Sequence, residues 1–149
     1  GLLRVGMIVR GPGVLQGQCI DAPVSTLDLA STFFDYADAS AQLTQHGRSL
    51  KPMLDGKPET RDFAYSEWEL SSGRVGVALS LRTVRTKTDK MTLDLKSGAG
   101  ELYDLEDDPH EMENRFDDPA YSARRKELTE MIYARPDDAG PVSAAVGTA

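Results

Sequence analysis

An almost unbroken run of apolar residues opens the chain and constrains its fold more than any other feature. Residues 2–9 are apolar except for Arg4 and include three β-branched residues, and the turn Gly11-Pro12-Gly13 follows them. Such a run is typical of a strand that is buried on both faces, as in a parallel sheet. That strand needs neighbouring strands and covering helices, and the rest of the chain offers few. We therefore expect the chain to be the later part of a longer α/β polypeptide.

An amphipathic helix is predicted next, over about residues 26–37. Ser25 and Asp28 stand at capping-box spacing, with aspartate in place of the usual glutamate. Apolar residues at helical spacing form one broad face that would suit packing on a sheet: Leu27, Ala30, Phe33, Phe34 and Ala37. Residues 38–62 are polar and contain helix breakers, so we expect a surface connection around an apolar anchor at residues 50–54.

The pattern changes from helical to alternating after residue 62. Residues 63–70 predict a strand. A second strand is predicted to begin at Val75, with Ser80 and Arg82 on its solvent-exposed face. Residues 91–95 alternate in the same way, and residues 101–105 follow a glycine-containing turn. Together these segments predict a small antiparallel sheet with one buried face and one solvent-exposed face.

A last helix is predicted to begin at Asp118, a good N-cap that is followed by proline. Its apolar stripe consists of Tyr121, Leu128, Met131 and Ile132, and the basic run Arg124-Arg125-Lys126 is expected on a solvated face. Pro136 ends the helix. The sequence thus divides into residues 1–37, a connection over 38–62, a sheet-and-helix subdomain over 63–136 and a flexible tail over 137–149.

Composition excludes several classes of partner. The net charge of −7 repels a phosphate backbone, so no nucleic-acid partner is expected. No apolar run approaches the roughly 20 residues that cross a bilayer, so no membrane-spanning segment is expected. The single cysteine excludes an intrachain disulfide framework and slightly favours a reducing, cytoplasmic compartment.

Groups that could perform catalysis are sparse. Cys19 is the one thiol, and a role as nucleophile competes with that of a partly buried apolar thiol. His46 and His110 lie in polar loops without a second ligand at metal spacing. The acidic clusters at residues 106–108 and 117–118 lack EF-hand spacing and are expected to form turns and caps. We therefore assign no catalytic and no metal-binding residue.

Five segments, in order, resemble the C-terminal third of the sulfatase family, in the alkaline phosphatase superfamily. They are residues 1–13, 25–32, 47–54, 84–90 and 101–114. The last is similar to the signature Leu-Tyr-Asp-Leu, x, x, Asp-Pro, x, Glu, x, x, Asn. The longer motifs resemble those of the bacterial arylsulfatase, choline-sulfatase and phosphonate monoester hydrolase branch. Two residues depart from the family: Gly6 replaces a proline, and Asp89 stands where histidine or an aromatic is common, which changes the charge of a loop.

The resemblance implies an α/β fragment of an alkaline phosphatase-like fold. The fragment would be the terminal strand and helix of the central sheet, then a small antiparallel sheet packed with a helix. Full-length sulfatases hydrolyse sulfuric esters with a formylglycine, made from cysteine in Cys-x-Pro-x-Arg, and a divalent cation (calcium, magnesium or manganese). Asp21 and Pro23 stand where that motif would place proline and arginine after Cys19. The chain alone is therefore expected to be inactive.

The resemblance also implies partners and a pocket. The partners are the N-terminal catalytic part of the same enzyme and a small sulfate-ester substrate. A homo-oligomer is a further expectation, because the isolated chain would expose the edges of its first strand and the apolar face of its first helix. His46, Tyr65 and Trp68 are candidates to line the substrate pocket. Two alternatives stay open: a non-enzymatic relic or binding module, and the same region of a phosphonate or phosphate ester hydrolase.

Overall fold

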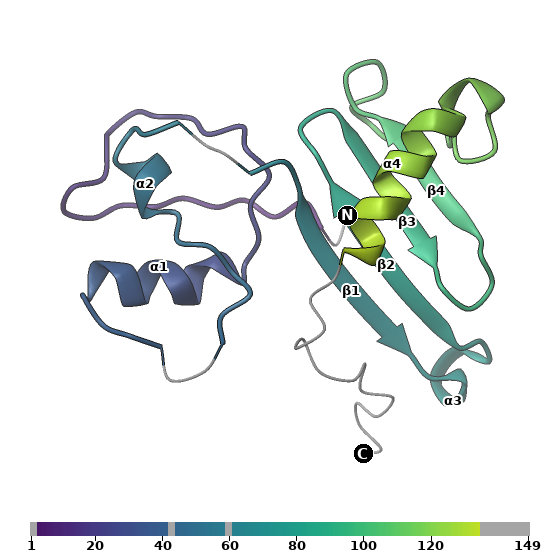
Figure 1. The fold of residues 1–149 in the computed structure, drawn as a ribbon, viewed down its shortest axis with the longest axis horizontal. Coiled ribbons are helices and arrows are strands. Elements are labelled where there is room, and N and C mark those ends of the chain that lie inside the picture. The colour runs from purple at the N-terminus through teal and green to yellow at the C-terminus, as the bar shows by residue number, and fades with distance from the viewer. Residues whose placement is uncertain (1–2, 42–43, 59–60, 135–149) are drawn as a thin grey trace. The chain divides into compact units, whose positions relative to one another are not determined.

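The computed structural model describes residues 3–41, 44–58 and 61–134, without the side chains of residues 74 and 75. Its contacts divide the chain into two units (Figure 1). The first comprises Gly1–Asp21 and Ser25–Thr60, and the second comprises Ala22–Val24 and Arg61–Ala149. The tail predicted over residues 137–149 lies outside the described residues. Among the described residues, no helix is long and apolar enough to cross a membrane.

Residues 3–10 of the first unit form no strand, so the strand predicted over residues 2–9 is wrong for this chain. Four of its apolar side chains are exposed, namely Leu3, Val5, Ile8 and Val9, and Ile8 reaches 98%. The physical reason is the missing neighbour: a strand owes its backbone hydrogen bonds to an adjacent strand. No backbone hydrogen bond is recorded for residues 3–10 within the part of the chain that the structure describes.

Helix α1 (Asp28–Tyr36) confirms the predicted helix. The Asp28 half of the capping box forms, since the Ser25 N–H donates to the Asp28 carboxylate at 2.7 Å. The other carboxylate oxygen accepts from the Arg48 N–H at 2.9 Å. The Thr32 hydroxyl donates to the Asp28 carbonyl at 2.6 Å and accepts from the Leu50 N–H at 2.8 Å. The polar side of α1 therefore holds the loop at residues 47–50.

Helix α2 (Lys51–Leu54) contains most of the predicted apolar anchor, which is confirmed. Leu50, Met53 and Leu54 are buried and form the small core of this unit. The loop before α2 approaches α1 very closely at Gly47. A Cβ at that position would stand 2.2 Å from the Leu27 carbonyl oxygen, so only glycine fits there.

The second unit is built on a four-stranded antiparallel sheet in the order β1-β2-β3-β4. The strands are β1 (Ala64–Leu70), β2 (Leu79–Arg85), β3 (Asp89–Asp94) and β4 (Gly100–Asp104). They confirm the predicted meander, except where a strand was expected to start at Val75. Helix α3 (Ser72–Val75) lies there instead, and Gly76, with a left-handed φ of 76°, ends it.

Helix α4 (Ser122–Tyr133) crosses the sheet and follows a 3₁₀ turn, η1 (Pro119–Tyr121) (Figure 1). Asp118 caps that turn as predicted, because its carboxylate accepts from the Ala120 N–H at 3.0 Å. The core consists of Val84, Met91, Leu93, Leu102, Leu128 and Ile132, with Tyr121 and Met131 packed against it. The predicted apolar stripe of the last helix is therefore confirmed.

The face assigned to β2 from the sequence is wrong. Strand register pairs Val84 with the core residue Met91, so Arg82 and Ser80, two and four residues away, share the helix-covered face. Both are buried. The leucines of β2 occupy the opposite face, where they are half-buried. Alternation fixed the period of the strand correctly but not the side that the helix covers.

Asp94, at the end of β3, makes stability depend on pH. Its carboxylate accepts from the Ser97 hydroxyl at 2.5 Å and from the Ser80 N–H at 2.9 Å. These hydrogen bonds, the Ser97 hydroxyl first, lower the pKa of Asp94 to about 2. Because the folded-state pKa lies below the ordinary value of 3.8, this stabilisation is present above about pH 4 and is lost as the pH falls towards 2.

Asp94→Asn should therefore lower stability at neutral pH and flatten its dependence on pH between 4 and 2. Urea unfolding of both proteins across this interval measures the effect. An equally steep loss of stability in the variant would contradict the assignment to Asp94.

Candidate functional site

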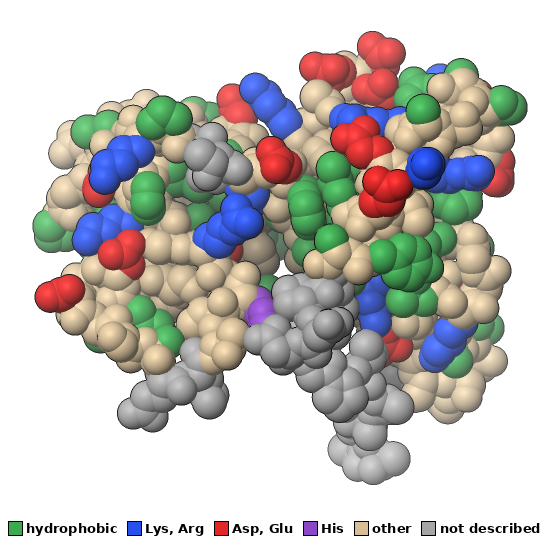
Figure 2. All heavy atoms as spheres, viewed as in Figure 1, with side chains coloured by type: hydrophobic (Ala, Val, Ile, Leu, Met, Phe, Trp, Pro, Cys, Tyr) green, Lys and Arg blue, Asp and Glu red, His purple; other side chains and the backbone are tan. Residues whose placement is uncertain are grey.

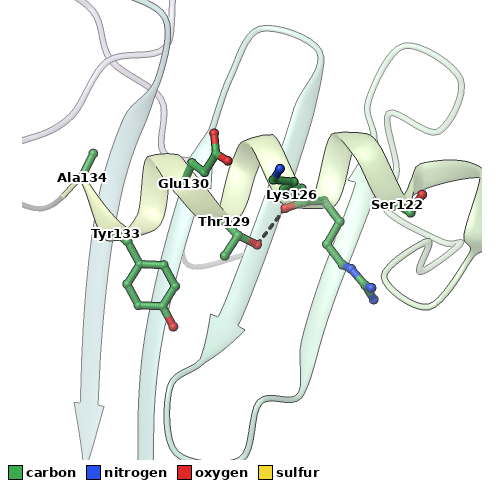
Figure 3. Close-up of a pocket in the computed structure, with 7 residues that line it drawn as sticks. Ser122, Lys126, Thr129, Glu130, Tyr133 and Ala134 are labelled. Carbon is green, nitrogen blue, oxygen red and sulfur yellow. Dashed lines mark hydrogen bonds between the residues drawn. The ribbon is translucent and has the colours of Figure 1, made fainter.

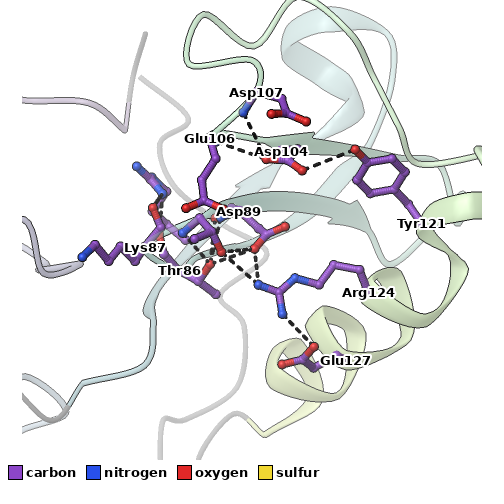
Figure 4. A network of polar contacts seen from close by, with 11 residues as sticks. Thr86, Lys87, Asp89, Asp104, Glu106, Asp107, Tyr121, Arg124 and Glu127 are labelled. Carbon is purple, nitrogen blue, oxygen red and sulfur yellow. Dashed lines mark hydrogen bonds and ion pairs between the residues drawn. The ribbon is translucent and has the colours of Figure 1, made fainter.

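A buried polar network joins the β2–β3 hairpin to α4 (Figure 4). At its centre is the Asp89 carboxylate, which accepts from the Arg124 guanidinium and from the Thr88 hydroxyl. The Thr86 hydroxyl also donates to this carboxylate, at 3.3 Å. Arg124 is held from its other side by Glu127, at 2.8 Å. The network fastens the hairpin to the helix.

The charges in this network are matched. Burial opposes ionisation of Asp89, but the hydrogen bonds from Arg124 and Thr88 outweigh it, so the pKa of Asp89 lies below its ordinary value. The hydrogen bond to Asp89 also raises the pKa of Arg124. Asp89 is thus a buried residue that fastens the hairpin to α4, and the prediction that it only changes the charge of a loop is wrong. The predicted solvated basic face is wrong for Arg124, and Arg125 donates to the Phe116 carbonyl at 2.7 Å.

A second buried network surrounds Arg82. Its guanidinium contacts the Glu69 carboxylate at 2.6 Å and lies 3.8 Å from Glu67. The Ser80 hydroxyl donates to Glu69 at 2.6 Å. Burial disfavours the charged form of Glu69, but the bonds from Ser80 and Arg82 lower the pKa of Glu69 overall. This pairing explains how an arginine occupies the helix-covered face of β2.

Residues of the sulfatase-like signature occupy structural positions. The Asn114 side chain accepts from the Leu102 N–H at 3.0 Å and donates to the Gly100 carbonyl at 3.2 Å, which closes the outer edge of β4. Asp104 accepts from the Glu106 N–H at 3.1 Å. The Asp108 carboxylate accepts two backbone N–H groups of the following turn. The acidic cluster at residues 106–108 therefore forms turns, as predicted.

The three pocket candidates belong to different units or to different faces of one sheet. His46 is exposed and belongs to the first unit, whereas Tyr65 and Trp68 belong to the second. Tyr65 and Trp68 stand three residues apart on β1 and so point to opposite faces of the sheet. Tyr65 packs against the core, and Trp68 is 46% exposed. Their role in a pocket stays a prediction.

Cys19 is exposed, so the interpretation of this residue as a partly buried thiol is wrong. Its Sγ lies 4.0 Å from a carboxylate oxygen of Asp21. Among the described residues, no group of three or more histidine, cysteine, aspartate or glutamate side chains could hold a metal ion. The described residues therefore do not fit a sulfatase metal centre.

A hollow of about 560 Å³ follows one side of α4 (Figure 3). Its lining residues belong to this helix or, in the case of the last, to its C-cap: Ser122, Arg125, Lys126, Thr129, Glu130, Tyr133 and Ala134. A single helix face does not enclose a ligand. On the face of the molecule in Figure 2, acidic and basic side chains are interspersed and form no single basic patch.

The fold and these structural clusters can now be compared with known proteins. The family model for the C-terminal region of N-sulphoglucosamine sulphohydrolase matches residues 2–137. The chain belongs to the sulfatase family. It is the C-terminal region of a sulfatase and falls in the alkaline phosphatase superfamily, as the sequence predicts.

Relatives of this sulfatase region include hydrolases of two kinds. A Delta 4,5-hexuronate-2-O-sulfatase of Bacteroides thetaiotaomicron is 34% identical over 127 residues, which are 81% of this chain and 26% of that protein. A solved 2-O GAG sulfatase has a TM-score of 0.69 at 33% identity, covering 86% of this chain and 29% of that one. Phosphonate monoester hydrolase of Agrobacterium radiobacter has a TM-score of 0.62 at 26% identity, covering 72% and 22%. The sulfatase region thus spans about a quarter of the length of these relatives.

Sequence reasoning missed the buried Arg82 and the half-buried Arg124 of this sulfatase region. Arg82 and Arg124 each pair with a carboxylate distant in the chain, Glu69 and Asp89. A single sequence gives no signal for such pairs, because the spacing of charges along the chain does not show which strands and helices meet. The nearest available signal for the pairing of Arg82 with Glu69 was that two neighbouring predicted strands carry side chains of opposite charge.

Proposed function

We propose that the chain is the C-terminal part of an enzyme that hydrolyses sulfuric esters, and that it contributes structure instead of the reacting groups. The match of residues 2–137 to a C-terminal sulfatase region carries this proposal. The buried clusters support it, because Arg82 and Arg124 are each paired within the chain and serve its packing.

The opening segment supports incorporation into a larger sheet. Residues 3–10 have a strand-type sequence but expose their apolar side chains. Burial of one such side chain is worth about 1.5–3 kcal/mol. In the complete enzyme this segment would be the terminal strand of a central sheet supplied by the N-terminal catalytic part.

The reacting groups would come from that N-terminal part as well. A formylglycine would supply the nucleophile there, and a divalent cation would polarise the ester. Cys19 does not fit the role of formylglycine precursor, because Asp21 and Pro23 follow it in place of proline and arginine. The substrate would be a small sulfate ester, and Trp68 and His46 remain the exposed candidates to touch its organic part.

A phosphonate ester is the second candidate substrate class. The likeness to the Agrobacterium radiobacter phosphonate monoester hydrolase, at 26% identity, favours it specifically. The hexuronate-2-O-sulfatase is more similar, at 34% identity, so sulfate esters come first.

Activity measurements test the proposal in two steps. The isolated chain, given a chromogenic sulfate ester and a divalent metal ion, should show no turnover above buffer. A longer polypeptide that includes the upstream coding sequence should hydrolyse the sulfate ester, and faster than the matching phosphonate ester. Turnover by the isolated chain that Cys19→Ala abolishes would contradict the proposal. So would a reading frame with no sulfatase sequence upstream.

A further inference from the structure

A stripe of side chains at coiled-coil spacing lines the hollow along α4 (Figure 3). The stripe repeats at intervals of four, three and four residues: Ser122, Lys126, Thr129 and Tyr133. Such spacing keeps side chains on one side of a helix, where a second helix can pack against them. The buried residues of α4, Leu128 and Ile132, belong to the core, so the stripe lies on another side of the helix.

The hollow results from the sizes of these side chains. Ser122 and Thr129 are small, whereas Tyr133 is 66% exposed and its ring projects from the helix. The rim at Arg125 is held in place, because its guanidinium donates to the Phe116 carbonyl at 2.7 Å and lies 5.1 Å from the centre of the Phe116 ring. The stripe therefore has a small residue at one end and a large, exposed aromatic residue at the other.

Two opposite charges flank Thr129 on this side of α4. Lys126 precedes it and Glu130 follows it, and both are exposed and line the hollow. Among the described residues, neither of these side chains has a recorded hydrogen bond or ion pair. Lys126 stands in the first half of α4 and Glu130 in the second half. A helix that runs in the opposite direction would therefore bring unlike charges together.

We propose that this side of α4 binds a second copy of the chain, packed antiparallel about a two-fold axis at the level between Lys126 and Thr129. A two-fold axis reverses the second helix, so the same stripe serves on both copies. Tyr133 of each copy then lies over Ser122 of the other and fills the hollow, while Lys126 comes within reach of Glu130. This contact does not depend on which ester the complete enzyme hydrolyses.

A second copy is favoured over an unrelated protein because one stripe supplies both members of each contact. The large residue meets the small one, and the cation meets the anion, only when the second helix is a reversed copy of the first. The 12 residues of α4 span about 18 Å. A pair of such helices is expected to bury less than the roughly 1,200 Å² of a standard interface, so the dimer should dissociate on dilution in the micromolar range.

Lys126→Glu and Glu130→Lys, studied alone and mixed, test the proposal. Each variant alone sets like charges against each other at two places in the dimer, so each should weaken dimerisation about tenfold or more. In an equimolar mixture each variant supplies the charge that the other lacks, so mixed dimers should form about as tightly as those of the unchanged chain. Sedimentation equilibrium over a dilution series measures the dissociation constants, and circular dichroism checks that the helix content is unchanged.

Lys57→Glu is the control, because Lys57 is exposed in the first unit and its substitution changes the net charge as Lys126→Glu does. This variant should dimerise like the unchanged chain. A chain that stays monomeric throughout the dilution series would overturn the inference and leave the hollow to residues 135–149 or to another protein. A dimer that both α4 variants leave intact would also overturn it, because another surface then forms the contact. So would a mixture that dimerises no more tightly than its components.

Discussion

Replacing Arg82 by methionine should lower the free energy of unfolding of the sheet-and-helix unit by about 3 kcal/mol. The substitution keeps the apolar stem but leaves the Glu69 carboxylate without its cation on a buried face. The lower end of the usual range applies because Glu69 remains 20% exposed and keeps its bond from Ser80. Trp68, the only tryptophan, lies on β1 and reports unfolding of this unit by fluorescence.

A second substitution separates pairing from packing. Glu69→Gln removes the orphaned charge and can still accept from the Ser80 hydroxyl. The double variant Arg82→Met/Glu69→Gln should therefore recover more than half of the stability that Arg82→Met loses. If the two substitutions simply add, the loss in Arg82→Met comes from packing and the role given to the ion pair is wrong.

Leu128→Ala should cost about 3 kcal/mol and lower the melting midpoint of the same unit by more than about 10 °C. Leu128 is fully buried where α4 meets the sheet, in one cluster with Val84 and Met91. Its truncation removes apolar burial and leaves a cavity between helix and sheet. Circular dichroism followed during heating measures the shift.

Met112→Ala is the matched control for this prediction, because Met112 is among the most exposed apolar residues. Its truncation should change stability by less than about 0.5 kcal/mol. A Leu128→Ala protein that melts with the wild type would show that α4 does not stabilise the sheet.

The polar clusters show which side-chain contacts could be predicted from the sequence and which could not. The caps at Asp118 and Asp108 could be predicted, because the group that binds each carboxylate lies within a few residues. Asp89 and Arg124 stand in different elements, so their pairing depends on where α4 crosses the hairpin. The separation of Tyr65 from Trp68 was implicit in strand periodicity, but which face the helix covers was not.

Helices α1 and α4, the antiparallel meander, the apolar stripe of the last helix and the sulfatase family could all be predicted from the amino-acid sequence. These depend on periodicity, turn chemistry and short motifs, which act over a few residues. Three features became visible only in the fold: residues 3–10 form no strand, α1 turns its polar side inward, and Arg82 is buried. Each of these depends on whether a partner from elsewhere in the chain is present, because hydrogen bonding, charge pairing and burial are satisfied between distant segments.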